Sequence, residues 1–270
     1  MKMQQAYDFR DENDAILELL SPLSDADFDQ PTGFKDWTFN DILAHLHYFN
    51  WMADLSMADE DRFVTEYARL NDLRDAGATL VEATDDILEH VKGQALLTLW
   101  HDYYPDMSER FADADPKHRV KWAGPDMSVR SSISARLMET WSHAQAMYDH
   151  LGVVRVNHDR IRNIVIMGIN TFGWTFINRK EEVPEDVPYI RLTAPSGEVW
   201  EWNEPSTSNV VEGLAEEFCQ VVTQSRNIAD TDLSVSGDTA TRWMSVAQCF
   251  AGPPMTPPAA GTRSTSENNS

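Results

Sequence analysis

The sequence has few cysteines and few basic residues. Only Cys219 and Cys249 occur in 270 residues, without a C-x-x-C spacing, which excludes a disulfide framework and is consistent with a reducing compartment. The 22 Lys and Arg residues face 44 Asp and Glu residues, so the formal charge is −22. Because this charge repels phosphate backbones and anionic lipid head groups, we expect neither nucleic acid nor a membrane as a partner.

Long apolar runs and nucleotide-binding motifs are also missing. No stretch approaches the roughly 20 apolar residues of a membrane-spanning helix, and the first residues, MKMQQAYDFRDEND, lack the apolar run of a signal peptide. We therefore expect a cytoplasmic protein, monomeric or homodimeric, that acts on a small molecule. The absence of Gly-x-Gly-x-x-Gly, Walker and Gly-x-Ser-x-Gly motifs disfavours nucleotide cofactors and serine hydrolase chemistry.

Helical patterns fill roughly the first two thirds of the chain. Apolar residues recur at helical spacing, and a capping box at Thr38-Phe39-Asn40-Asp41 and a cap at Ser128 mark two helix starts. Long helices with such stripes describe a mainly α protein built on a bundle. The expected helices cover residues 4–20, a segment from residue 38, and residues 76–92, 95–113, 128–151 and 157–179.

The residue pattern changes from helical to strand-like after Pro184. VPYIRLTAP and EVWEWN flank a Pro-Ser-Gly turn and predict a β-hairpin. We expect a helix at 207–226, a strand near 233–236 and a helix at 238–250 to follow. A chain of this length accommodates two modest domains. The predicted domains are a helical bundle at 1–183 and a small α/β domain at 184–251, followed by a disordered tail at 252–270.

Glu139 and His143 are the most informative pair in the sequence. Four residues apart on one predicted helix, they point the same way, so both can bind one metal ion with His45 as a third ligand. A His₂Glu set leaves one coordination position open, which is typical of a catalytic metal. Their position among Leu137 and Trp141 adds weight, because an unpaired carboxylate is costly to bury.

The spacing by itself is a weak signal, because acidic chains contain it by chance. Three such spacings occur here: Asp41 with His45, Asp86 with His90, and Glu139 with His143. His47 competes with His45 but points to another side of the same helix, whereas His45 shares a stripe with Ile42 and Phe49. We therefore favour His45 as the third ligand.

Further residues are candidates for supporting roles. Asp41 can accept the second ring proton of His45, or serve as a general base, although it can equally be a plain helix cap. Arg136 can clamp an anionic cofactor, or be a solvent-exposed helix arginine. Arg226 can reach a ligand, or only complement a helix dipole. Four tryptophans can line a pocket, although such aromatic residues usually serve packing: Trp37, Trp122, Trp141 and Trp174.

Several stretches resemble a known family. DWTFNDILAHL, MSVRSSISARLMETWSHAQAMYDHLGV, TFGWTFINR, LTAPSGEVWEWN and FCQVVTQSRN are similar to the mycothiol-dependent maleylpyruvate isomerase-like family of the DinB superfamily, and more closely to its uncharacterised metal-binding branch. The resemblance implies a DinB-like four-helix bundle followed by a small α/β domain resembling sterol carrier protein 2. It also implies His45, Glu139 and His143 as metal ligands, and Arg226 as the nearest match to an arginine that supports activity.

The resemblance also implies a reaction class. A divalent metal ion, with zinc favoured, would hold a low-molecular-weight thiol (mycothiol or glutathione) as a thiolate for isomerisation or thiol transfer on a small organic acid. Two alternatives stay open. One is a metal-dependent hydrolase or lyase without thiol. The other is a non-catalytic small-molecule or acyl carrier, whose feature would be the aromatic hairpin Val199-Trp200-Glu201-Trp202.

Overall fold

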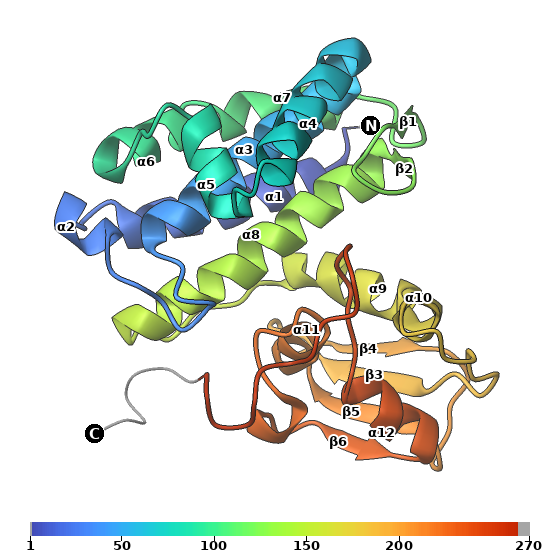
Figure 1. Ribbon diagram of the computed structural model, residues 1–270. Helices are drawn as coiled ribbons and strands as arrows, with labels where there is room; N and C mark the ends of the chain where they lie inside the picture. Colours follow the sequence, from blue (N-terminus) through green and yellow to red (C-terminus); the bar gives the residue numbers. More distant parts are fainter. Residues whose placement is uncertain (1, 264–270) are drawn as a thin grey trace. The chain divides into compact units, whose positions relative to one another are not determined.

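The computed structural model describes residues 2–263, and in this range the protein is mainly helical with one small mixed sheet (Figure 1). The chain forms two compact units, Met1–Met147 and Tyr148–Ser270. The division falls within the last turns of the long helix α8, Val129–Leu151. The fold class predicted from the sequence, mainly α with a small α/β part, is confirmed at this level.

The first unit consists of helices and one short two-stranded ribbon. Its elements are α1 Gln4–Leu20, α2 Asp25–Phe28, α3 Phe39–Ala58, α4 Glu60–Asp75, α5 Leu80–Ile87, α6 Gly93–His101, α7 Tyr104–Asp113, β1 Arg119–Val120, β2 Met127–Ser128 and most of α8. The expected helix starts are confirmed at Thr38, which caps α3, and at Ser128, whose Oγ accepts the backbone N–H of Ser131 at 3.1 Å.

Helix α3 is the central element of the first unit. It packs against α2, α4, α5, α6 and α7, and most of its residues are buried. Other helices surround α3 on several sides. His45 and His47 point to different sides of this helix, and both are buried. One part of the surrounding core is formed by Tyr48, Met52, Leu55, Phe63, Leu70, Ala83 and Ile87.

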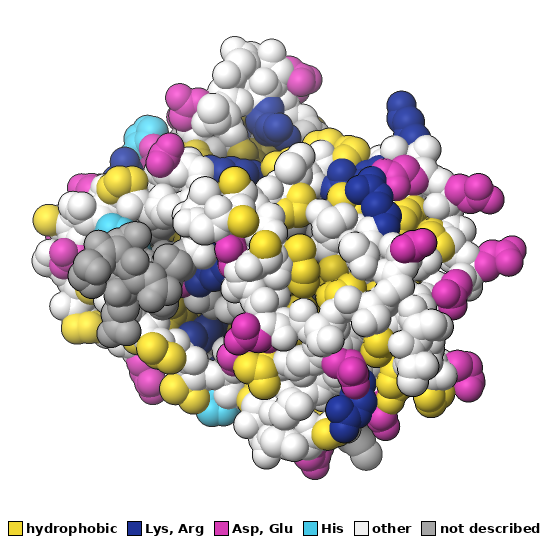
Figure 2. Space-filling view, turned by 90° about the horizontal axis from the view of Figure 1, so that it is seen from below, with side chains coloured by type: hydrophobic (Ala, Val, Ile, Leu, Met, Phe, Trp, Pro, Cys, Tyr) yellow, Lys and Arg dark blue, Asp and Glu magenta, His cyan; other side chains and the backbone are white. Residues whose placement is uncertain are grey.

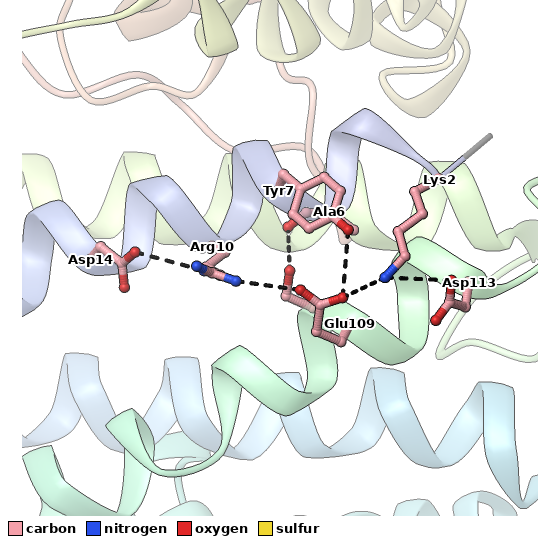
Figure 3. Close-up of polar contacts among 8 residues, drawn as sticks. Lys2, Ala6, Tyr7, Arg10, Asp14, Glu109 and Asp113 are labelled. Carbon is pink, nitrogen blue, oxygen red and sulfur yellow. Dashed lines mark hydrogen bonds and ion pairs between the residues drawn. The ribbon is translucent and has the colours of Figure 1, made fainter.

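Helices α1 and α7 are joined by a surface network of charges. Lys2 and Arg10, from the N-terminal segment and α1, converge on Glu109 of α7 in Figure 3. The Nζ atom of Lys2 lies 2.8 Å from Glu109 Oε2, and Arg10 Nη1 lies 3.3 Å from Glu109 Oε1. These side chains are between 42 and 49% exposed, so solvent screens the network and its contribution to stability is small.

The second unit contains a four-stranded sheet and short helices. Its elements are the end of α8, η1 Asp159–Ile161, α9 Arg162–Asn170, α10 Phe172–Asn178, β3 Tyr189–Thr193, β4 Val199–Trp202, β5 Val210–Leu214, α11 Ala215–Val222, η2 Ile228–Asp230, β6 Ser234–Ser236 and α12 Asp238–Met244. The strand order is β4-β3-β5-β6, in which β3 and β5 are parallel and the other pairs are antiparallel.

The two faces of this sheet differ in polarity. On β3, Ile190 and Leu192 are buried, whereas Arg191 between them is exposed. Arg191 lies between two carboxylates on the neighbouring strands, 3.7 Å from Glu201 and 3.6 Å from Glu212. This alternation is typical of a sheet with one packed face and one solvated face.

Several predicted helix boundaries differ from the structure. Helix α4 is not predicted from the sequence, because only Phe63 and Leu70 of its residues are buried and its apolar periodicity is weak. The single helix expected at 157–179 is broken at Thr171, whose hydroxyl donates to the Met167 and Gly168 carbonyls. The helix expected at 207–226 is wrong for 210–214, since these residues form β5 between β3 and β6.

The predicted domain limits also differ from the structure. The bundle was expected to end at residue 183, yet α9 and α10 belong to the second unit, where α9 packs against α11. Gly168 makes this close approach possible, because a Cβ there would lie 2.9 Å from Val222 and 3.0 Å from Phe218. Residues 184–251 therefore share their core with residues that the sequence assigned to the bundle.

The predicted disordered tail, 252–270, differs from the structure over its described part. Side chains of the second unit bind backbone groups of this segment: Gln248 Nε2 donates to Pro253 O at 3.1 Å, and Asn227 Nδ2 donates to Pro258 O at 2.8 Å. Gly261 N donates to Asp230 Oδ1 at 2.8 Å. Residues 252–263 are thus fixed by hydrogen bonds, and residues 264–270 of the predicted tail lie outside the described residues.

Two properties of the described residues concern the surface charge and the apolar character of the helices. Figure 2 shows Asp and Glu side chains scattered over the face in view, in keeping with the formal charge of −22. No helix in the described range 2–263 combines the length and the apolar character that a membrane span requires.

Candidate metal centre

Three side chains singled out by the sequence converge in the first unit. His45 lies on α3, and Glu139 and His143 lie one turn apart on α8. The Nε2 atoms of His45 and His143 lie 3.3 and 3.1 Å from one carboxylate oxygen, Glu139 Oε2. One nitrogen of each ring and one oxygen of Glu139 all lie within 4.8 Å of one another. Atoms held this close can surround one divalent ion at metal–ligand distances of about 2 Å.

The local sequence explains how the three side chains meet. Thr38 Oγ1 accepts the Asp41 N–H at 3.1 Å and Asp41 Oδ2 accepts the Thr38 N–H at 2.8 Å, so a capping box fixes the start of α3 two turns before His45. On α8 the four-residue interval places Glu139 and His143 on one side of the helix. The sequence predicted this interval, and the packing of α3 and α8 within one unit supplies the third side chain.

Burial and mutual hydrogen bonding set the protonation of the site. Burial lowers the pKa of His45 to about 4, although the hydrogen bond with Glu139 opposes this shift. Burial works to raise the pKa of Glu139, but hydrogen bonds with His143 and His45 outweigh it and hold that pKa well below its usual value. A neutral imidazole and an ionised carboxylate are the forms that bind metal. The residues present therefore fit a divalent ion.

Aromatic rings enclose the two imidazoles. Trp37 stacks on His143 with ring centroids 5.7 Å apart and planes at 10°, and Phe34 meets the same ring edge-on at 4.9 Å. Phe49 lies 4.8 Å from the His45 ring. The side chains of both histidines are 11% exposed and that of Glu139 is 25% exposed. The site is thus an apolar-walled position that reaches solvent mainly at the carboxylate.

The competing histidines lie elsewhere. His47 is buried against Tyr103, with ring centroids 5.4 Å apart, and has no carboxylate partner among the described contacts. His90 pairs with Asp85 at 2.8 Å in an exposed contact rather than with Asp86. Of the three acid-x-x-x-His spacings, the one at Glu139 and His143 is therefore the one that forms part of a ligand cluster in the described residues.

Asp41 does not orient His45. Its carboxylate accepts the Thr38 backbone N–H, while His45 Nδ1 is buried and has no hydrogen-bond partner among the described residues. The prediction that Asp41 accepts the second ring proton of His45 is therefore wrong. The helix-cap alternative is confirmed, because the capping box directs the carboxylate toward Thr38 at the start of α3.

Arg136 is a buried residue, not the solvent-exposed arginine that was its alternative. It is 2% exposed, its Nε donates to Asn50 Oδ1 at 2.9 Å, and its guanidinium lies 5.9 Å from the Phe49 ring centroid. Burial lowers its pKa to about 10, with Glu139 opposing the shift. Arg136 thus links α8 to α3 one turn before Glu139, and its binding of an anionic cofactor stays a prediction.

Arg226 lies in the second unit, directly after the turn that ends α11. Its Nη2 lies 2.5 Å from Asp149 Oδ1, and its Nη1 donates to the Ser225 carbonyl at 3.0 Å. The two side chains of this ion pair are only 9 and 13% exposed. The charge of Arg226 is therefore balanced within its own unit, and its predicted catalytic role stays a prediction.

Of the aromatic residues around the imidazoles, Trp37 and Phe49 were indicated by the sequence and Phe34 was not. Of the four tryptophans considered, Trp37 contacts both imidazoles, and Trp122 lines a small apolar crevice of about 160 Å³. Trp141 is fully buried core, and Trp174 is 40% exposed in the second unit. Phe34 was not considered. Its only signal in the sequence was its place in the Gly33-Phe34-Lys35-Asp36 segment before the α3 cap.

Comparison with known proteins places the chain among uncharacterized relatives. Two uncharacterized proteins of Mycobacterium tuberculosis, from strains CDC 1551 and H37Rv, are each 34% identical over 247 residues. The alignment covers 92% of this chain and 95% of each relative. The shared region therefore extends over both compact units.

Solved structures of an isomerase share the fold. A crystal structure of the mycothiol-dependent maleylpyruvate isomerase is similar with a TM-score of 0.51 and 17% identity, covering 81% of this chain and 87% of that chain. A histidine-to-alanine mutant of that isomerase gives 0.50 and 16% over the same shares. At such identity the likeness concerns the fold alone.

A family description fits the part of the chain that holds the candidate ligands. The family described as the mycothiol maleylpyruvate isomerase N-terminal domain matches residues 9–148, a range that includes His45, Glu139 and His143. This match spans more than half of the chain. The chain belongs to the mycothiol maleylpyruvate isomerase N-terminal domain family, within the DinB-like superfamily.

Proposed function

We propose that this protein is a metal-dependent enzyme that uses a low-molecular-weight thiol to isomerise a small organic acid. The observation that carries the proposal is the convergence of His45, Glu139 and His143 within 4.8 Å of one another. Family membership and the shared fold of the mycothiol-dependent maleylpyruvate isomerase support the thiol and the reaction class. Mycothiol and glutathione are both candidate thiols, and thiol transfer is the related reaction that the same site would serve.

The ligand set favours zinc as the ion. Two imidazole nitrogens and one carboxylate oxygen are a common catalytic zinc set, in which the fourth position is left for a water or a substrate. A divalent ion bound there would hold a thiol as its thiolate near pH 7, which makes the sulfur nucleophilic.

The protein residues would prepare the site for this chemistry. His45 and His143 would each supply a ring nitrogen to the ion, and ionised Glu139 would offset part of its charge. Trp37 and Phe34 would limit the access of water on the His143 side, because their rings pack against that imidazole. Such a thiolate would add to a conjugated cis double bond of the acid, forming a C–S bond while the π electron pair moves to the conjugated carbonyl as an enolate. Rotation about the resulting single bond, return of the electron pair and cleavage of the C–S bond would give the trans product and release the thiolate.

The alternatives have less support in the structure. A hydrolytic route needs a general base, and Asp41, the candidate named from the sequence, holds the α3 cap instead. For a carrier, the aromatic hairpin would have to offer a ligand surface. Trp200 is 4% exposed, and the Arg162 guanidinium lies 5.3 Å from its ring centroid and 5.9 Å from that of Trp202. These rings are already engaged in packing within the second unit.

Metal analysis of the purified protein tests the site. We expect about one zinc ion per native chain and almost none in His143→Ala, because a catalytic site has only three protein ligands. His90→Ala is the matched control, since His90 also follows an acidic residue by four positions but lies at an exposed contact. Equal metal content in the native protein and His143→Ala would refute the site.

An activity assay tests the thiol. Native protein loaded with zinc should convert a small cis-dienoic acid to its trans isomer only when mycothiol or glutathione is added, followed by ultraviolet absorbance. A chelator should stop the reaction, and renewed zinc should restore it. Turnover of a candidate substrate without added thiol would instead support the hydrolase or lyase alternative.

A further inference from the structure

His45, the candidate metal ligand on α3, lacks the hydrogen bond that usually orients such a ligand. Metal-binding histidines almost always donate their second ring N–H to a carboxylate, a carbonyl or water, and this bond fixes the plane of the ring. His45 Nε2 faces Glu139, so Nδ1 is the nitrogen that would donate. That atom is buried without any partner among the described residues. Something else must therefore hold the plane of the His45 ring.

Aromatic packing surrounds the ring instead. The His45 ring centroid lies 4.8 Å from that of Phe49, 5.4 Å from that of Trp37 and 4.6 Å from that of His143. Trp37 also stacks nearly parallel on His143 at 10°. Trp37 is thus the one residue among these contacts that touches both imidazoles from outside the ligand set. Its ring limits the rotation of both.

Trp37 is itself held by a closed turn, which we call the aromatic turn, residues 31–38. Thr32 N and Thr32 Oγ1 each donate to Trp37 O at 2.8 Å, and Trp37 N donates to Phe34 O at 2.9 Å. An antiparallel bridge between Pro31 and Thr38 closes the turn at the α3 cap. The turn and His45 are therefore anchored to the same helix end.

The aromatic turn contains unusual backbone geometry. Lys35 and Asp36 have φ angles of 54° and 58°, which are left-handed conformations that residues with a Cβ seldom adopt. Glu89 and His90 have the same conformation at an exposed turn away from the candidate centre, so this geometry marks a tight turn and does not by itself indicate a site. In the aromatic turn its consequence is positional, because it reverses the chain and brings Phe34 and Trp37 together at 5.3 Å between ring centroids.

We propose that the aromatic turn orients the metal ligands, and that Trp37 is a positioning residue which replaces the missing outer hydrogen bond by packing against both imidazoles. This inference rests on the metal site of the proposed function. Without a carboxylate behind His45, its imidazole would be a weaker donor, and a bound ion would keep more of its positive charge. Such an ion favours an anionic sulfur ligand over neutral water, which fits a thiol-using enzyme.

The test compares three variants in zinc affinity, measured by competition with a chromophoric chelator. Trp37→Leu should bind zinc about 10- to 100-fold more weakly, the range seen when outer partners of metal ligands are removed. Trp37→Phe, which keeps a ring, should recover most of the loss. Trp174→Leu is the control, because Trp174 is 40% exposed and lies in the second unit. Its affinity should equal that of the native protein.

A spectroscopic readout separates orientation from simple structural damage. In the cobalt-substituted protein, the visible absorption bands report ligand geometry, and Trp37→Leu should shift them while Trp174→Leu does not. Zinc affinity within twofold of native and unchanged cobalt bands in Trp37→Leu would overturn the inference alone. If Trp37→Leu does not fold, Trp37→Phe decides the matter. Native zinc affinity and native cobalt bands in Trp37→Phe would support the inference, and a loss of zinc affinity of about 10- to 100-fold in Trp37→Phe would overturn it. Native protein without zinc affinity would overturn both this inference and the proposed function.

Discussion

The candidate metal centre of the first unit and the Arg226–Asp149 pair of the second unit both bury charge, but in opposite ways. In the pair a cation and an anion meet at 2.5 Å and satisfy each other. In the candidate metal centre one carboxylate oxygen lies 3.3 and 3.1 Å from two imidazole nitrogens, and these three atoms are of the kinds that bind a divalent ion. A complementary pair needs no further partner, whereas two imidazoles and a carboxylate held this close can accept a cation once the imidazole protons are released. The pair is complete in itself, whereas the His45, Glu139 and His143 cluster leaves room for a further partner.

The largest expected effect is loss of metal from the centre. Glu139→Gln keeps the shape of the side chain but removes its charge, so zinc affinity should fall by more than the ~10- to 100-fold typical of outer partners. His45→Ala should do the same, whereas His47→Ala on the same helix should retain the native affinity. Calorimetric titration measures the zinc affinity of all three variants. Loss of zinc affinity in His47→Ala would contradict the choice of His45 over His47 as the metal ligand.

The next effect concerns stability in the second unit. Asp149→Ala removes one partner of a nearly buried ion pair and leaves Arg226 uncompensated, so we expect about 3 kcal/mol of destabilisation in urea unfolding. Zinc affinity should be unchanged if the pair is structural. The double variant Asp149→Leu with Arg226→Met should regain part of the stability, because apolar residues of similar volume often replace such pairs. A native-like unfolding midpoint in Asp149→Ala would contradict the structural role.

A smaller effect on stability is expected from Gly168→Ala in the second unit, with Gly173→Ala as its control. Gly168→Ala should cost about 1–3 kcal/mol, because the new methyl group would overpack against Val222 and Phe218. Gly173→Ala places its Cβ 3.8 Å from Val183, an ordinary contact. There the gain in helix propensity should stabilise the protein by about 0.5–1 kcal/mol. Thermal unfolding of the two variants should move in opposite directions, and equal shifts would argue against the close approach of α9 and α11.

The smallest effect is expected at the exposed network of Figure 3. The hydrogen bond from Lys2 holds the pKa of Glu109 below its usual value. Since the folded-state pKa is the lower one, the stabilising contribution is present above the unfolded-state value of about 4.3 and is lost as pH falls through the folded-state pKa. Glu109→Gln should therefore lower Tm slightly at pH 7 and low salt, and not at acidic pH or in ~1 M salt. A decrease independent of salt would point to packing instead.

Local chemistry made part of the fold predictable. The Thr38 capping box, the Ser128 cap and the apolar stripe of α8 are interactions within a few residues, and each is confirmed. The limits of α4 and β5 were not predictable in this way. Helix α4 is largely solvated, and β5 exists because β3 and β6 lie beside it, a fact that no local pattern carries.

The sequence by itself determined that Glu139 and His143 share one face of a helix, because a four-residue interval on an α-helix has only one geometry. It also made His45 the better choice over His47, through the stripe that each occupies. Only the tertiary structure decided that α3 and α8 bring the three side chains together, that Asp41 caps a helix rather than holding His45, and that Trp37 covers both imidazoles. These contacts join residues far apart in the chain, and their distances depend on how whole helices pack.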